Sequence, residues 1–426
     1  MTAYPLNRTK ISDSIYFSSV VDARYKTNRI SINLFIPLQK ETVSANALIP
    51  FVLRKGCADY PDFTQLNQKL YSLYGSYLDT DVRKSGDNQV IGLSITGIDN
   101  AYTLEGENII KEMTDILFAI LLRPCLPDGL FSEKELNLER QMLIDLIESE
   151  INEKRSYAIR RALETMCAGD PYGIDKYGTV EQVKSISQKE LTEAYRSLIR
   201  SASIEILFVG CGNPEIALQE TKKAFADMPH LPAAGITSQA FSGHGPVKEK
   251  TEKLQVSQSK LVMGFSTGVH AADPDINAMR LMTALYGGTP LSRLFQHVRE
   301  KLSLCYYCAA RFDRAKGILL VDSGVEKQNI QKAKEEILRQ LAVIQDGAFT
   351  DQEFEQAVLS MVDNLKSVND SLGGTEAWYL QQICYGTKVT PEEEAQNLRQ
   401  ITRDDVIAAA QKVRLDTIYV LTGEEE

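Results

Sequence analysis

The chain has 426 residues, of which 43% are hydrophobic and 24% charged. This length and composition are typical of a globular protein with two to four domains and substantial cores. The formal net charge of -10 argues against a nucleic-acid-binding surface, because such surfaces concentrate Lys and Arg to displace counterions from phosphates.

Three features of the sequence indicate the cellular compartment of the protein. The N-terminal sequence lacks a charged segment followed by an apolar one, so we expect no signal peptide. The longest apolar run, 116–122, is far shorter than the roughly 20 residues that span a bilayer, so we expect no membrane association. The seven cysteines are scattered along the chain without the spacing of a disulfide framework. A reducing, cytoplasmic location is therefore predicted.

The first half predicts a sheet packed against helices. A helix begins at Asp62, with Gln65 three residues on, and ends at Gly75. A second, longer helix begins at Ser132, with Glu135 in the same capping arrangement. The other expected elements are strands at 29–36, 76–82 and 89–97, an amphipathic helix at 108–122, and a helix, turn and buried strand over 186–210.

The second half repeats this order after roughly 215 to 230 residues. The matching segments are strands at 260–266, 304–312 and 317–325, helices at 291–301 and 330–344, a capped helix from Thr350, and the closing unit at 401–423. Six matched pairs indicate a duplication. We predict an α+β fold with two homologous halves, 1–227 and 257–426, joined by a Pro-, Gly- and Ser-rich linker at 228–256.

Three stretches resemble the insulinase / mitochondrial processing peptidase family. They are LNQKLYSLYGSYLDTDVRKS, LERQMLIDLIE with DPYGIDKYGTVEQVKSIS, and YGGTPLSRLFQHVREKLSLCYY. The resemblance covers nearly the whole chain and implies a clamshell in which each half is a mainly antiparallel sheet packed against helices. Within this family, the chain resembles the bacterial members that work as paired subunits.

The resemblance places a zinc motif, HxxEH, on the first helix, with a further Glu on the long helix. That chemistry needs two imidazoles and a carboxylate for the metal, and a Glu as general base. Here the corresponding positions are Ala47, Pro50, Phe51 and Leu146, which are all apolar. We therefore expect no metal site and no cofactor in this chain.

No other group in the sequence replaces that site. The four histidines, His230, His244, His270 and His297, show no ligand spacing. Cys305 and Cys308 are expected in one strand, where residues three apart point to opposite faces, so we interpret them as small strand residues.

The second half keeps a pair that the resemblance marks as functional. The segment REKLSLCY is similar to the family pattern REKxGLAY, which places Arg299 and Tyr306 on the residues that bind the substrate backbone and the oxyanion. A guanidinium and a phenol are suitable donors for developing negative charge. The alternative is a surface ion pair for Arg299 and a sheet-edge position for Tyr306. Ser303 stands where the pattern has Gly.

Gly287 and Gly288 lie in YGGTPLSRL, which resembles the glycine-rich loop near the substrate of processing peptidases. Glycines there permit close approach of a peptide backbone. A simple turn between helices is the alternative.

Two hypotheses on function remain. In the first, the chain is the non-zinc subunit of a heterodimeric peptidase: it binds a peptide or protein substrate by strand addition and completes the site of a homologous subunit that carries HxxEH and zinc. In the second it is an inactive structural, binding or accessory subunit, for example one associated with elongation factor P modification, as the resemblance also implies. A homodimer remains possible.

Overall fold

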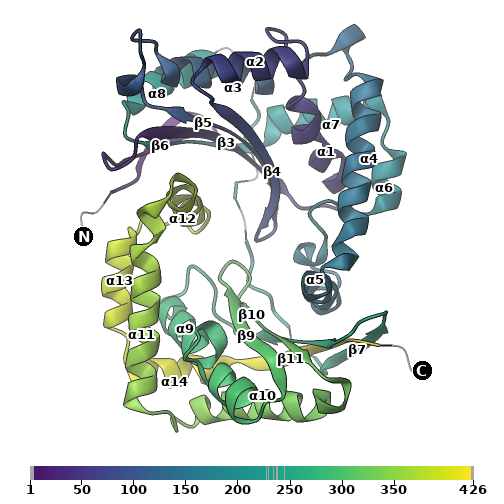
Figure 1. The fold of residues 1–426 in the computed structure, drawn as a ribbon, viewed down its shortest axis with the longest axis vertical. Coiled ribbons are helices and arrows are strands. Elements are labelled where there is room, and N and C mark those ends of the chain that lie inside the picture. The colour runs from purple at the N-terminus through teal and green to yellow at the C-terminus, as the bar shows by residue number, and fades with distance from the viewer. Residues whose placement is uncertain are drawn as a thin grey trace.

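The computed structural model describes residues 4–226, 228, 230–233, 235–236, 238–243 and 245–423. The chain forms two lobes whose sheets face each other (Figure 1). The first lobe contains a six-stranded sheet and the second a five-stranded sheet, each covered by helices. The predicted α+β class and the division into two halves are confirmed.

The first sheet has the strand order β1-β2-β6-β3-β5-β4. Its neighbouring strands are antiparallel, except that β2 runs parallel to β6. Strand β4 therefore forms one edge of the sheet. The bounds are β1 Asn7–Ser12, β2 Ile15–Val21, β3 Thr27–Pro37, β4 Tyr77–Ser85, β5 Asn88–Ile98 and β6 Ser203–Gly210.

The second sheet repeats this topology in the order β7-β11-β8-β10-β9. Here β7 is parallel to β11, as β2 is to β6, and the remaining pairs are antiparallel. The agreement of order and direction in five strands bears out the duplication inferred from the sequence. The bounds are β7 Lys248–Lys253, β8 Ser259–Ser266, β9 Cys305–Asp313, β10 Ile318–Val325 and β11 Arg414–Thr422.

Fourteen α-helices surround the two sheets in the described part of the chain. In the first half they are α1 Val43–Leu53, α2 Phe63–Ser72, α3 Ile109–Leu122, α4 Glu133–Ser149, α5 Lys154–Met166, α6 Val180–Ser185, α7 Gln188–Ser201 and α8 Pro214–Phe225. In the second half they are α9 Ile276–Thr283, α10 Ile330–Gln345, α11 Asp351–Lys366, α12 Leu372–Cys384, α13 Pro391–Arg399 and α14 Arg403–Lys412. The predicted caps at Asp62, Ser132 and Thr350 are present.

Each half contributes one helix that packs against the sheet of the other half. Helix α5 of the first half packs on β8 and β11, and α12 of the second half packs on β3 and β6 (Figure 1). An apolar cluster joins Phe35, Val90 and Leu207 of the first sheet to Trp378 and Tyr379 of α12. Because each inner sheet face is covered by the opposite half, neither half buries its own sheet completely.

An ion cluster also joins the lobes. Lys316, in the turn between β9 and β10, is only 1% exposed in its side chain. Its Nζ lies 2.6 Å from Asp87, in the turn between β4 and β5, and 3.1 Å from Asp170, after α5. A buried ammonium needs such paired carboxylates, so the hairpin tip is held against the first lobe.

The connection between the halves includes a strand. Strand β7 lies inside the segment 228–256 and adds to the second sheet beside β11. Residues 227, 229, 234, 237 and 244, which include His244, lie outside the described residues. None of the described helices combines the length and the apolar character needed to cross a bilayer.

Candidate functional site

Helix α1 carries three of the four positions of the expected zinc motif. Nine of its eleven residues are buried, because it lies between the sheet and the helices α4 and α7. Ala47 and Pro50 are buried in the core of the first half, and Phe51 packs against that core. These side chains offer no lone pair for a metal, and zinc requires nitrogen, sulfur or oxygen ligands.

The fourth position, Leu146 on α4, is 44% exposed. The nearby buried carboxylate on this helix, Glu139, is already paired: it lies 3.0 Å from Arg54 and 2.6 Å from Lys55, which follow α1. This ion triad ties α1 to α4. The donor set therefore does not fit zinc, and we derive no chemistry through a metal here.

The remaining candidate ligands are also dispersed. The ring of His230 bonds to the carbonyl of Ile199, and that of His270 to Asp273. Burial lowers the pKa of His297. Within the described ranges, no three His, Cys, Asp or Glu side chains come together as a group that could hold a metal ion.

Arg299 and Tyr306 line one surface hollow of about 550 Å³ in the second half. The Tyr306 side chain is 81% exposed, and the Arg299 guanidinium lies over the ring of Phe295 at 4.5 Å. Glu300 is 3.5 Å from Arg299, and an exposed pair of this kind adds little stability. The other lining residues are Gln258, Ser303, Leu304, Cys305 and Glu326.

Irregular backbone shapes this hollow. The predicted helix 291–301 is a π-helical segment over Leu294–Lys301, in which Leu302 donates its N–H to the carbonyl of His297. Such segments are frequent at functional sites. Ser303 follows with φ of 49°, the left-handed region that glycine adopts more easily. A left-handed turn therefore lies at the position where the family pattern has Gly and this chain has Ser303.

The two glycines of the predicted substrate loop differ from each other. Both lie in a second π-helical segment, Ala284–Gly288. Gly287 is buried, and a Cβ there would lie 2.7 Å from the backbone nitrogen of Ala310 on β9. Gly288 is exposed, and its Cβ would meet only Thr283 and Ala284. Gly287 therefore serves helix–strand packing, and substrate contact remains a prediction for the pair.

The interpretation of Cys305 and Cys308 as residues on opposite faces is wrong. The register between β9 and β10 shifts at Gly324 and Val325, so that one residue of β9, Tyr306, is extra. This β-bulge turns Cys305 to the side of Cys308, so that both side chains pack in the same apolar core of the second half, and each thiol shifts the pKa of the other. Strand β9 itself carries no glycine or proline that would mark the bulge.

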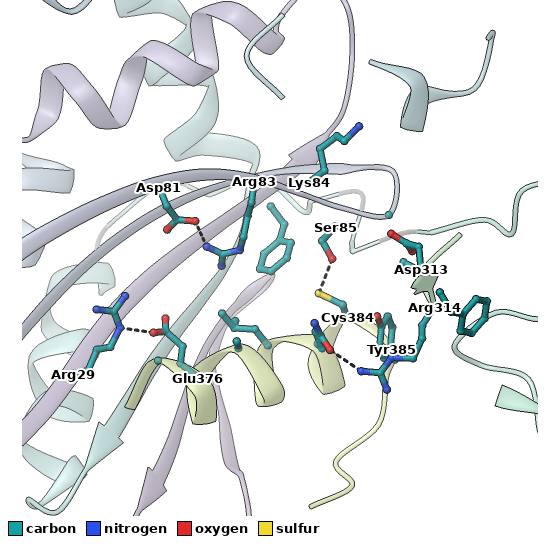
Figure 2. A pocket seen from close by; sticks show the side chains of 18 of the residues that line it. Arg29, Asp81, Arg83, Lys84, Ser85, Asp313, Arg314, Glu376, Cys384 and Tyr385 are labelled. Atoms are coloured by element: carbon teal, nitrogen blue, oxygen red, sulfur yellow. Dashed lines mark hydrogen bonds and ion pairs between the residues drawn. The ribbon is translucent and has the colours of Figure 1, made fainter. Parts of the chain in front are cut away.

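A larger chamber of about 600 Å³ lies between the lobes (Figure 2). Its three arginines bond to other side chains of its wall: Arg29 to Glu376, Arg83 to Asp81, and Arg314 to Gln381 at 2.6 Å. The wall is built by β3 and the edge strand β4, by α12, and by the β9–β10 turn. Sequence analysis did not find this chamber. The alternation of Asp79, Asp81 and Arg83 along β4 was the available signal for its polar face.

Comparisons with known proteins agree with this description. A family model described as "Peptidase M16 inactive domain" matches residues 185–361. The chain is 28% identical over 402 residues to the "Probable inactive metalloprotease YmfF" of Bacillus subtilis, and the match covers 94% of both chains. It is 21% identical to an "Uncharacterized zinc protease" of Rickettsia bellii, over 75% of this chain and 78% of the other.

Solved structures share the fold. A protein from Enterococcus faecalis superposes with a TM-score of 0.91 at 23% identity, over 99% of each chain. A protease from Helicobacter pylori gives a TM-score of 0.81 at 14% identity, over 98% of this chain and 99% of the other. Both matches extend over the two lobes, so the whole clamshell is shared.

Proposed function

This chain belongs to the insulinase family of peptidases as a member without the zinc ligands, and from that premise we propose that it is the non-catalytic subunit of a peptidase pair. It binds an extended peptide and presents Arg299 and Tyr306 to the zinc site of a homologous subunit. The observation that carries this proposal is the exposed hollow that contains both side chains.

The first half supports a non-catalytic role. Ala47 and Pro50 are packed inside the core, and Leu146 has no donor atom. Water activation by zinc needs a ligand set with an open position and a general base, and neither is available here. Any peptide cleavage therefore depends on the metal of another subunit.

The second half supports the contribution to a partner. Arg299 supplies a permanently charged, multi-donor group and Tyr306 a phenolic O–H, and both line the same hollow. Such donors stabilise the oxyanion of a tetrahedral intermediate when they are placed before the reaction. The exposure of Tyr306 leaves its hydroxyl accessible to a second molecule.

The chamber supports peptide binding. Strand β4 is an edge strand, and its inward residues Asp79, Asp81 and Arg83 line the chamber. An edge strand presents backbone N–H and C=O groups with which an extended peptide can pair. Because pairing through the backbone needs no particular side chain, this binding mode suits a subunit that binds peptides of many different sequences.

The test is reconstitution with a homologous HxxEH subunit of the same cell. Copurified pairs are assayed for peptide cleavage with wild-type chain, Arg299→Ala, Tyr306→Phe, and the exposed control Arg399→Ala on α13. Loss of a single oxyanion donor is worth about 10²- to 10³-fold in kcat, and we expect a fall of that order for Tyr306→Phe. The control and the zinc content of the pair should not change.

The same assay separates the alternative, an inactive accessory subunit that contributes surface and no chemistry. If the double variant of Arg299 and Tyr306 leaves kcat of an active pair unchanged, the shared-site proposal fails and the accessory role stands. The name of the Bacillus relative, an inactive metalloprotease, is compatible with either role.

A further inference from the structure

Two thiols lie side by side where β9 begins. Cys308 pairs with Ser323 and Tyr307 with Gly324, but the next pair joins Cys305 to Val325. Tyr306 is left over as the bulged residue. Because side chains alternate along a strand, one extra residue restores both cysteines to the same side.

The packing of the neighbours agrees with this geometry. Cys308 belongs to the apolar core of the second half, and Cys305 packs against that same core. Tyr307, between them, lies on the other side of the sheet, where Arg155 of α5 sits 4.2 Å from its ring. The two sulfurs thus share one environment while the aromatic ring between them faces away.

The two thiols differ in access. Cys308 is 4% exposed, whereas Cys305 lines the hollow that contains Arg299 and Tyr306. The neighbouring Cys308 thiol lowers the pKa of Cys305, and Ser323 and the charge of Arg299 act in the same direction. The thiolate is the reactive form of cysteine, so Cys305 is the more nucleophilic thiol of the pair.

The other cysteines show the opposite tendency. Burial raises the pKa of each remaining thiol outside this pair, at positions 57, 125, 167, 211 and 384. These thiols stay protonated over a wider pH range and react more slowly. The pair at β9 is therefore chemically distinct within the chain.

We propose that Cys305 and Cys308 form a redox-active dithiol that low-molecular-weight disulfides, such as oxidised glutathione, convert into an intramolecular disulfide. The Cys305 thiolate attacks one sulfur of the small disulfide, forms a mixed disulfide and releases one small thiolate. Cys308 then gives up its proton and attacks the sulfur of Cys305, which releases the second small thiol. Two protein thiols and one disulfide thus become one protein disulfide and two small thiols.

The product changes the bulge. A disulfide requires the two sulfurs to lie about 2.05 Å apart, and the backbone between the two cysteines includes Tyr306. Oxidation therefore repositions a side chain of the hollow. The chemistry itself does not depend on the proposed function, because the thiols react whether or not a partner subunit uses Tyr306.

The test uses the full-length reduced chain and oxidised glutathione. Free thiols are trapped with N-ethylmaleimide at successive times, and the tryptic peptide 302–311, which contains both cysteines, is weighed by mass spectrometry. We expect this peptide to become lighter by two hydrogens and to lose its reaction with the trap. Its initial rate should exceed that of Cys125, which is the matched partly exposed thiol, by about tenfold.

Two variants identify the steps. Cys308→Ser should stop at the glutathione adduct of Cys305, and Cys305→Ser should leave Cys308 reduced because that thiol is buried. The inference is overturned if the wild-type peptide stops at the glutathione adduct, or if it reacts no faster than Cys125. Should a serine variant fail to fold, the wild-type product and its rate decide the question alone.

Discussion

The two halves share one topology and differ most where chemistry would occur. In the first half, the three expected motif positions on α1 are filled by side chains that lie in the core or pack against it, with Ala47 fully buried. In the second half, Arg299 and Tyr306 project into an open hollow. The first region is packed core, and the second is exposed and open to contact.

Under the proposed function, this difference means that the duplicated fold lacks the metal site in one half and carries the contact residues for a partner in the other. A buried apolar position is fixed by the volume and polarity of its neighbours, so donor atoms cannot return singly without disturbing the core. An exposed side chain carries little of the folding energy, and its chemistry can be kept or changed at little cost in stability. The predictions below test this contrast, beginning with the largest effect.

Restoring a metal ligand in the first half should be strongly destabilising. Ala47→His adds a larger, polar ring to a fully buried site, and overpacking with burial of an unpaired polar group should cost about 3 kcal/mol. Ala408→His, on the exposed side of α14, is the control and should cost less than about 0.5 kcal/mol. Chemical denaturation measures both. Equal costs for the two variants would contradict the view of α1 as closed core.

In the second half, the contrast predicts different costs at two adjacent glycines. Gly287→Ala places a Cβ 2.7 Å from the backbone of Ala310 and should cost about 1–3 kcal/mol. Gly288→Ala meets its nearest atom, the Thr283 carbonyl oxygen, at 3.2 Å and should cost clearly less. Thermal unfolding of the two variants gives the order. A larger loss of stability for Gly288→Ala than for Gly287→Ala would contradict the packing role of Gly287.

The turn before Tyr306 offers a stabilising change. Ser303 has φ of 49°, so Ser303→Gly relieves backbone strain and should raise the free energy of unfolding by about 0.5–1 kcal/mol. The control Ser197→Gly, on the exposed face of α7, should lower it by about 0.5 kcal/mol because glycine weakens a helix. If both substitutions change the free energy of unfolding in the same direction, the effect at Ser303 does not come from its left-handed backbone conformation.

Much of the fold followed from the sequence because local signals were strong. Side-chain caps such as Asp62 and Thr350, amphipathic helices and buried strands placed the main elements, and their repetition predicted the two halves. The loss of the metal ligands was also readable, since Ala47 and Pro50 have no donor atoms whatever the fold. Those predictions needed only residue chemistry and spacing.

The features that depend on distant contacts were not predicted. The exchange of α5 and α12 between the lobes, and the chamber that α12 helps to enclose, arise from contacts between elements of different halves. No glycine or proline on β9 itself marks the bulge at Tyr306, so Cys305 was assigned to the wrong face. The polar chamber wall at Asp81 and Arg83 was visible only as an alternation on one strand.

The smallest effect on stability is expected at the residue with the clearest proposed role. Tyr306 is 81% exposed, so Tyr306→Ala should change the free energy of unfolding by less than about 0.5 kcal/mol. Tyr71→Ala on α2, where the ring is 75% exposed, is the matched control and should behave alike. In the reconstituted pair the two must differ: only Tyr306→Ala should lower kcat for peptide cleavage. A stability loss of more than about 2 kcal/mol at Tyr306 would instead mean that its ring is needed for packing. The hollow would then be a structural feature, and the contrast between the closed first half and the open second half would fail.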